Sequence, residues 1–248
     1  MEFIAAWRFL TIIPVPGLRT NTEKEIGGSL VYFPIVGAII GLIMAGLAWL
    51  LELIVPQIVV SVLVVIATII VTGAMHLDGL ADTSDGLGGR TVAERQEIMH
   101  DSRHGTFGVA AIVGLIVLKV VTLTSLPQHW LLPALVVIPA IGRWTMMYCV
   151  TAYRYARPSG LGTIFKGNSM LSFLIGTILA AAVSVVLFYW AGLIVVILTF
   201  GIAAAAAYGF KRLFGGLTGD NYGAINEIAE VAVLLILVIL TNKNWLLT

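Results

Sequence analysis

The sequence predicts an all-α, polytopic membrane protein: one domain, residues 1–248, built as a bundle of about seven transmembrane helices preceded by an N-terminal interfacial helix. Hydrophobic residues make up 59% of the chain and charged residues 11%, against about 25% charged in an ordinary soluble domain. Several uninterrupted apolar stretches reach the length of about 20 residues that a helix needs to cross a bilayer. Because these stretches are continuous and do not alternate, they argue against a transmembrane β-barrel.

The first residues are predicted to form a helix at the membrane surface. This apolar stretch carries Glu2 and Arg8, is broken by Pro14, Pro16 and Gly17, and lacks a small-residue cleavage pattern. We therefore expect an interfacial helix there and not a signal peptide.

Seven spans follow from apolar runs that end at charged residues or at Pro and Gly. They are predicted at residues 29–55, 57–77, 106–126, 130–152, 170–190, 192–210 and 229–247.

The connections between these spans differ in basic residues. The short ones near Pro56, Gln128 and Ala191 carry no Lys or Arg. The remaining segments outside the spans do carry Lys or Arg, and they are residues 1–28, 78–105, 153–169 and 211–228. The positive-inside rule places these basic connections and the N-terminus in the cytoplasm, so both acidic regions of the chain, residues 78–101 and 220–230, are expected to open to the cytoplasm.

Carboxylates beyond Glu52 are confined to two windows, which are residues 78–101 and 220–230. In the first window Asp78, Asp82 and Asp85 fall within about a 60° sector of a helix, so that they share one face. Carboxylates beside lipid are costly, and such a group needs a compensating cation or water. No Lys or Arg lies between Val55 and Arg90 to pair with them locally.

The rest of that window contains a second acidic face, formed by Glu94, Glu97 and Asp101. The two faces could close around a cation, and hard oxygen ligands favour magnesium, manganese or calcium over zinc. Salt bridges with Arg90, Arg95 and Arg103 on a solvated helix are the alternative, and for Glu94 and Glu97 this alternative is equally good.

The stretch between the two acidic windows contains basic residues that have no acidic neighbour in sequence. They are Lys119, Arg143, Arg154, Arg157 and Lys166. Arg and Lys beside a metal site suit a phosphate or pyrophosphate. Arg154 and Arg157 could equally be topology determinants, and Lys119 could snorkel or pair with a carboxylate of another helix. His76, His100 and His104 flank the acids, and a proton-transfer role for one of them stays open.

The second acidic window places Asp220 and Glu227 on one helical face if that segment is helical. We expect it to form a second polar lip on the same side of the membrane. The alternative is that Asp220 is the N-cap of the last helix.

Two resemblances follow from these motifs. Asp82-Thr-Ser-Asp85-Gly86-Leu-Gly-Gly89-Arg90 resembles the opening of the CDP-alcohol phosphotransferase signature. A resemblance to the cobalamin synthase family (adenosylcobinamide-GDP ribazoletransferase) covers almost the whole chain. The segments that carry it are Phe9 to Pro16, Tyr32 to Gly37, His76 to Gly86, Ile98 to Gly105, Gly142-Arg143 and Thr218 to Glu227.

The second resemblance implies a magnesium-dependent phosphotransferase of the EC 2.7.8 class, in which manganese could substitute. It would join adenosylcobinamide-GDP to α-ribazole or its 5′-phosphate and release GMP. The metal ligands implied are Asp78, Asp82, Asp85 and Asp101, and the catalytic residues are Asp82, Asp85 and Asp101, with Asp101 as the base. Arg90, Arg103, Arg143, Asp220 and Glu227 would bind substrate or phosphate.

The expected partners are these substrates and membrane lipid, with no nucleic acid, and a homo-oligomer stays open. Another CDP-alcohol-type phosphotransferase and a cation-coupled transporter are the alternative functions. A transporter predicts acids near the bilayer midplane and weak symmetry between halves. An intramembrane aspartyl protease would need two Asp on different spans.

Overall fold

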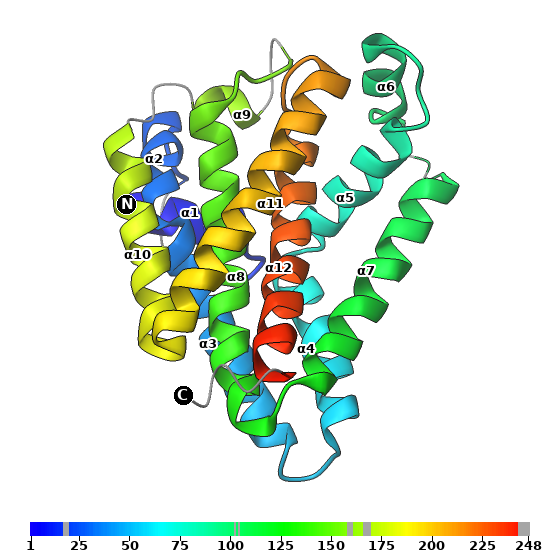
Figure 1. Ribbon diagram of the computed structural model, residues 1–248. Helices are drawn as coiled ribbons and strands as arrows, with labels where there is room; N and C mark the ends of the chain where they lie inside the picture. The colour runs from blue at the N-terminus through cyan, green and yellow to red at the C-terminus, as the bar shows by residue number, and fades with distance from the viewer. Residues whose placement is uncertain (17–19, 102, 104, 158–160, 166–169, 243–248) are drawn as a thin grey trace.

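The computed structural model describes residues 1–16, 20–101, 103, 105–157, 161–165 and 170–242. Its elements are α1 (Glu2–Leu10), α2 (Glu23–Gly28), the 3₁₀ helix η1 (Ser29–Tyr32), α3 (Phe33–Leu51), α4 (Gln57–Val71), α5 (Met75–Gly86), α6 (Val92–Ile98), α7 (Thr106–Ser125), α8 (Gln128–Ala152), α9 (Leu161–Ile164), α10 (Met170–Phe188), α11 (Trp190–Phe214) and α12 (Gly219–Asn242). This confirms the all-α prediction (Figure 1).

Within the described residues, 6 helices are long and apolar enough to cross a membrane, or up to 7 if the bent pair α4–α5 is one span. The protein is therefore a multi-pass membrane protein. The predicted spans are located correctly, with two differences. The last helix starts at Gly219 and not at 229, and the second span is interrupted.

The interruption lies between α4 and α5, whose axes differ by 89°. Gly73 and Ala74 both have left-handed backbone conformations, with φ of 61° and 57°. Two successive left-handed residues turn the chain sharply. Glycine adopts this conformation readily, whereas alanine rarely does. The predicted span 57–77 is therefore not one continuous helix, and α5 runs obliquely toward α6 (Figure 1).

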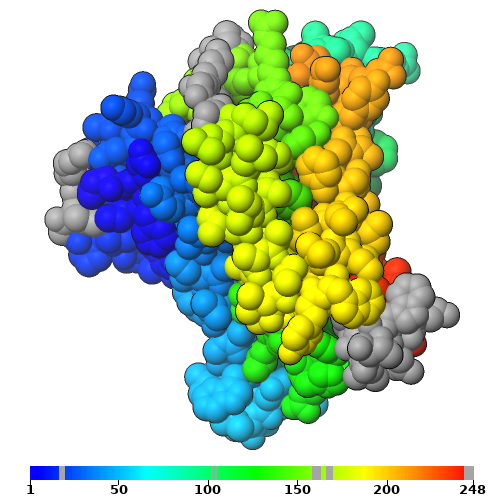
Figure 2. Space-filling model, turned by 60° about the vertical axis from the view of Figure 1, so that its left-hand side comes forward, coloured from blue at the N-terminus to red at the C-terminus, as the bar shows by residue number. Residues whose placement is uncertain are grey.

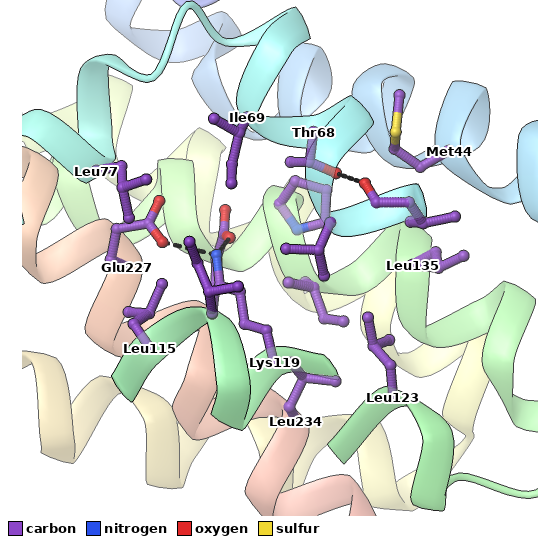
Figure 3. A pocket seen from close by; sticks show the side chains of 16 residues that line it. Met44, Thr68, Ile69, Leu77, Leu115, Lys119, Leu123, Leu135, Glu227 and Leu234 are labelled. Carbon is purple, nitrogen blue, oxygen red and sulfur yellow. Dashed lines mark hydrogen bonds and ion pairs between the residues drawn. The ribbon is translucent and has the colours of Figure 1, made fainter. Parts of the chain in front are cut away.

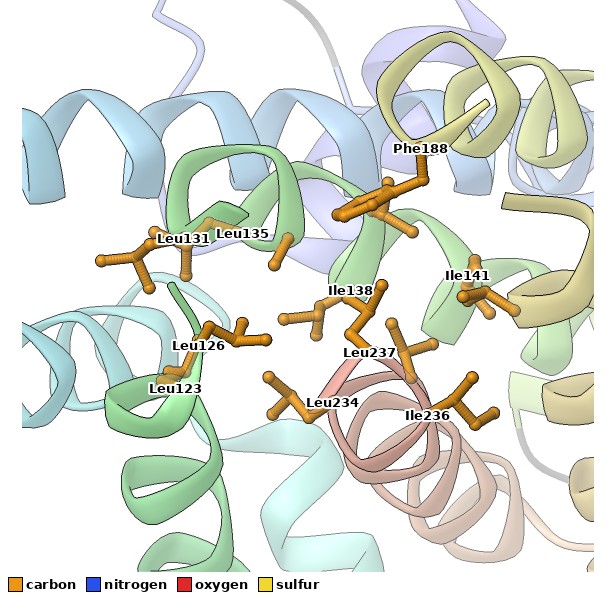
Figure 4. Packing of buried hydrophobic residues seen from close by; sticks show 14 of the residues in the cluster. Leu123, Leu126, Leu131, Leu135, Ile138, Ile141, Phe188, Leu234, Ile236 and Leu237 are labelled. Atoms are coloured by element: carbon orange, nitrogen blue, oxygen red, sulfur yellow. The ribbon is translucent and has the colours of Figure 1, made fainter. Parts of the chain in front are cut away.

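The centre of the bundle is formed by α8 and α12, the most buried of the spans. Helix α3 lies directly against α8, because a Cβ on Gly37 or Gly41 would collide with the α8 backbone at Pro139 or Leu135. Small residues between membrane helices commonly allow such a close approach. Leucine and isoleucine side chains from α7, α8 and α12 fill the adjacent core, with Phe188 of α10 (Figure 4).

The N-terminal segment packs against the bend between α4 and α5. α1 is a helix, as predicted, and its Leu10 is fully buried. The Ile12 amide donates to the carbonyl of Val71, the last residue of α4, at 2.8 Å. Figure 2 shows the N-terminal residues, in dark blue, gathered on one side of the molecule, away from the α3–α4 connection at its lower end. The segment thus supports the bend that sets the direction of α5.

Candidate active site

Helix α5 carries the three acidic residues of the first window, and it is held against the start of α12 by small residues. A Cβ on Gly79 would lie 2.6 Å from the carbonyl oxygen of Asp220, so the two helices meet backbone to backbone. Along α5, Asp78 is exposed, Asp82 is half-buried and Asp85 is buried. The acidic face therefore runs from the surface into the protein.

Asp85 caps the N-terminus of α7. Its two carboxylate oxygens accept hydrogen bonds from the amides of Gly105 at 2.7 Å and Gly108 at 2.8 Å. A helix N-terminus carries unpaired amides and a partial positive charge, both of which stabilise a carboxylate. This contact explains how a buried carboxylate is tolerated, and the sequence pattern did not reveal it.

A wide cavity of about 490 Å³ opens beside Asp85. Its lining is Asp85, Ile98, Asp101, Arg103, Gly105, Thr106 and Phe107. Asp101 and Arg103 form an ion pair at 2.7 Å, and the Arg103 side chain is 88% exposed. Hydrogen bonds from Arg103 lower the pKa of the Asp101 carboxyl from 3.8 to about 2, so Asp101 is a carboxylate at neutral pH. The cavity thus brings together two expected carboxylates and one expected phosphate-binding arginine.

Helix α6 positions one edge of this cavity. Thr91 and Glu94 form a capping box at its N-terminus, and the Glu94 carboxylate also accepts from the Arg90 amide at 2.8 Å. Arg95 donates to the carbonyl of Leu213 and Gln96 donates to the carbonyl of Phe214, which ties α6 to the end of α11. Glu94 therefore has a structural role in a cap, and the exposed Arg90 side chain does not line the cavity.

A second, narrower cavity of about 140 Å³ lies at the other end of the acidic face. It is lined by Phe9, Met75, His76, Asp78, Met146, Phe165, Gly219, Asp220, Tyr222 and Gly223. Asp220 lies in the first turn of α12 and pairs with Arg157 at 3.2 Å. Asp78 and Asp220, which come from separate acidic windows, thus line one cavity. This agrees with the expectation that the two windows lie on the same side of the membrane.

The rest of the second window lies inside the bundle and not at a lip, which corrects the expectation for Glu227. Lys119 of α7 contacts Glu227 and Glu230 of α12, each at 2.6 Å (Figure 3). Arg143 of α8 pairs with Glu230 and is 1% exposed. These four residues form the buried ionic cluster, in which two cations balance two carboxylates. The option that Lys119 pairs with a carboxylate of another helix is confirmed.

The cluster also bears on the expected phosphate ligands. Arg143 and Glu227 each have a buried ionic partner. Their surroundings therefore give no support to the expectation that they bind substrate. Sequence spacing could not reveal these partners, because Arg143 and Glu230 are 87 residues apart.

Comparison with known proteins decides the family. A model of the cobalamin-5-phosphate synthase family matches residues 2–238. The chain belongs to this family.

Relatives in the cobalamin-5-phosphate synthase family span nearly the whole chain. A protein of Roseiflexus sp. is 38% identical over 245 residues, covering 98% of this chain and 91% of the relative. One of Desulforamulus reducens is 35% identical and covers 93% of each chain. One of Geotalea daltonii is 34% identical, with 97% of this chain and 98% of the relative covered. All three carry the name adenosylcobinamide-GDP ribazoletransferase. No solved structure matches the chain.

For this family member, the donor chemistry of the acidic face suits magnesium. Asp78, Asp82, Asp85 and Asp101 offer hard oxygen ligands. Among the residues that the structure describes, no three His, Cys, Asp or Glu side chains are grouped closely enough to hold a metal ion alone. Magnesium usually keeps several waters and is bound by one or two carboxylates together with substrate phosphates. The acidic face fits that mode of binding and does not form a cage made only of protein ligands.

Proposed function

We propose that this protein is an adenosylcobinamide-GDP ribazoletransferase, and hence a phosphotransferase of the EC 2.7.8 class. The observation that carries the proposal is that relatives of this name match the chain over nearly its full length at 34–38% identity. The acidic face of α5 supports the proposal, because that face lies between the wide and the narrow cavity. Arg103 lines the wide one.

In the proposed reaction, a ribose hydroxyl of α-ribazole or its 5′-phosphate attacks the phosphorus attached to the cobinamide side of adenosylcobinamide-GDP. A new phosphorus–oxygen bond to the ribose forms, and the bond to the bridging pyrophosphate oxygen breaks. GMP leaves with that oxygen, and the hydroxyl proton passes to a base of the protein. In-line transfer of this kind depends mainly on positioning and on compensation of phosphate charge.

Asp101 is the proposed base. It lines the wide cavity and is a carboxylate at neutral pH, and the contact with Arg103 that lowers its pKa also makes it a weak base while that contact lasts. In the structure its oxygens are held by Arg103. A pyrophosphate in the cavity would compete for the same guanidinium, because arginine binds phosphate through paired N–H donors. Movement of Arg103 from Asp101 to phosphate would then leave the carboxylate open to the attacking hydroxyl.

The proposed cofactor is Mg²⁺, with Mn²⁺ as a substitute, held by Asp78, Asp82, Asp85 and Asp101. When bound, the ion supplies charge stabilisation for the pyrophosphate oxygens. Asp85 also has a structural task, since it holds the N-terminus of α7 and thereby fixes one wall of the wide cavity. Arg90 and Asp220 remain proposed substrate contacts at the two ends of this region.

We place both cavities on the cytoplasmic side of the inner membrane, where nucleotides and magnesium are available. The support is the positive-inside rule, because the connections beside these cavities carry most of the chain's Lys and Arg. Membrane lipid and, as an open option, further copies of the chain are the other proposed partners.

The test is GMP release by purified protein in detergent or liposomes, given adenosylcobinamide-GDP and α-ribazole 5′-phosphate, with and without magnesium. Release that requires both substrates and the metal supports the proposal. A folded protein that releases no GMP under these conditions contradicts it.

A further inference from the structure

Helix α5 packs against the first turns of α12 with one face and carries the proposed metal ligands on another (Figure 1). His76, Gly79 and Thr83 fall within about a 60° sector of α5, at roughly 100° per residue. All three contact α12. The acidic face forms a second sector, about 130° further round the helix. The rotation of α5 about its own axis therefore decides where the carboxylates point.

Glycines bring the two helices into close contact. A Cβ on Gly79 would lie 2.6 Å from the carbonyl oxygen of Asp220. On the other side, a Cβ on Gly223 would lie 3.1 Å from Cα of His76. Small residues at such an interface let two backbones approach each other. These contacts depend little on direction, because the van der Waals attraction between any one pair of atoms is weak. They hold α5 against α12 without fixing its rotation.

A buried hydrogen bond supplies the direction. Nδ2 of Asn221 on α12 donates to Oγ1 of Thr83 on α5 at 3.0 Å, and the two residues are 0% and 1% exposed. A hydrogen bond weakens steeply when its donor and acceptor are misaligned. If α5 turned, the buried amide of Asn221 would lose this partner, which is costly. The bond thus favours one rotation of α5 against α12.

The side chain of Asn221 is itself fixed by the start of α12. The backbone amide of Thr218 donates to Oδ1 of Asn221 at 3.0 Å, and the backbone amide of Asn221 donates to Oγ1 of Thr218 at 3.3 Å. These reciprocal bonds have the pattern of a capping box. Because Oδ1 faces a backbone N–H, Nδ2 is the atom that faces Thr83. The donor therefore has a set position on α12.

We propose that Asn221 and Thr83 are positioning residues for the metal site. Their hydrogen bond fixes the rotation of α5 and so directs the acidic face toward the two cavities, which Asp78 and Asp85 line. Thr83 directly follows Asp82 and precedes Asp85 by two residues, so a change in its contact reaches both carboxylates through a short stretch of helix. This inference rests on the proposed function, because it takes the acidic face as the site that holds the ion.

The test measures Mn²⁺ binding to the full-length protein in detergent, with GDP present to supply phosphate. The electron paramagnetic resonance signal of free Mn²⁺ reports the bound fraction. Thr83→Val removes the acceptor at nearly constant volume and should raise the dissociation constant for Mn²⁺ about tenfold, as loss of a contact behind a metal ligand commonly does. Half-maximal GMP release should require more Mg²⁺ by the same factor. Thr83→Ser keeps the hydroxyl and should bind Mn²⁺ as the wild type does.

A double-mutant cycle tests the contact itself. Asn221→Ala should also weaken Mn²⁺ binding. Adding Thr83→Val to Asn221→Ala should have little further effect, because both changes remove the same hydrogen bond. Two effects that add in full would overturn the inference, since they would show that the residues act separately.

The matched control is Thr145→Val on α8. Thr145 is fully buried, like Thr83, but its hydroxyl donates to the Gly142 carbonyl of its own helix at 2.7 Å. The change removes a buried hydroxyl without touching the contact between α5 and α12. It should leave Mn²⁺ binding unaltered, even where the thermal midpoint falls.

The outcomes separate positioning from a purely structural role. A folded Thr83→Val protein with a lower thermal midpoint but wild-type Mn²⁺ binding overturns the inference and leaves the proposed function in place. Equal weakening by Thr83→Ser overturns it as well, because serine retains the acceptor. If Thr83→Val does not fold, Asn221→Ala gives the same comparison of midpoint and binding. Asp82→Asn is the reference for loss of a ligand. Wild-type Mn²⁺ binding in that variant contradicts the proposed metal site, and the inference with it.

Discussion

Two sets of charged side chains in this protein differ in how their charge is compensated. In the buried ionic cluster, Lys119 and Arg143 are matched by Glu227 and Glu230, and all four side chains are largely hidden from solvent. On the acidic face of α5, Asp78 and Asp85 each line a cavity. The cluster is closed by its own ion pairs, whereas the acidic face opens to two cavities. Charges that are matched inside the bundle serve its packing, whereas carboxylates that line a cavity are placed where the proposed chemistry could use them.

The largest effect should come from Asp82→Asn on the acidic face. An amide is a poorer ligand for a hard cation than a carboxylate, and turnover should fall by about 1,000-fold or more, equal to roughly 4 kcal/mol of transition-state stabilisation. GMP release in magnesium measures this, with thermal unfolding as the check that the protein still folds. Turnover near that of the wild type would remove Asp82 from the proposed metal ligands.

Glu230→Gln tests the cluster. This change leaves the buried Lys119 and Arg143 with one carboxylate between them, and breaking a buried ion pair costs about 3–5 kcal/mol. The thermal midpoint in detergent should drop by several degrees, while Glu97→Gln on the surface should leave it unchanged. Equal midpoints for both variants would contradict a stabilising cluster.

Gly108→Ala tests the contact that links the acidic face to α7. A Cβ at Gly108 would meet the Asp85 carboxylate and lie 3.0 Å from the carbonyl of Ala81. Overpacking of this kind costs about 1–3 kcal/mol, and turnover should fall because Asp85 is displaced.

Gly114→Ala in the same helix is the matched control for this change, since a Cβ there meets nothing within 4 Å. It should be neutral or stabilising by roughly 0.5–1 kcal/mol. If both glycine variants behave alike, the position of Asp85 does not depend on Gly108.

Arg103→Ala should give the smallest change, because it removes an exposed ion pair with Asp101 and one proposed phosphate contact. We expect turnover to fall about tenfold through loss of phosphate contact. The pKa of Asp101 is lowered from 3.8 to about 2 by Arg103, so the variant should titrate this carboxyl near its ordinary value. Because the folded-state pKa is the lower one, the pair is intact above about pH 4 and is lost as pH falls through about 2. Isotope-edited NMR of Asp101 measures the shift, and an unchanged titration in Arg103→Ala would contradict the pairing.

The sequence was enough to locate the spans and to place Asp78, Asp82 and Asp85 on one helical face, because apolar runs and helical periodicity are local properties. It also offered, as one of two options, that Lys119 pairs with a carboxylate of another helix. It did not reveal the bend at Gly73 and Ala74, since alanine gives no warning of a left-handed conformation. Nor did it show that Asp85 caps α7 or that Arg143 pairs with Glu230, because both contacts depend on how separate helices pack.

The origin of the cluster's two carboxylates bears on how the protein is made. Glu227 and Glu230 both lie on α12, the last of the described helices, while Lys119 and Arg143 lie on α7 and α8. During synthesis, the two cations enter the membrane before these anions exist. A nascent chain that stops before α12 carries two positive charges without these partners inside an apolar bundle, and it also lacks one wall of the narrow cavity. Neutralisation of Lys119 and Arg143 and completion of the narrow cavity therefore both depend on the insertion of α12.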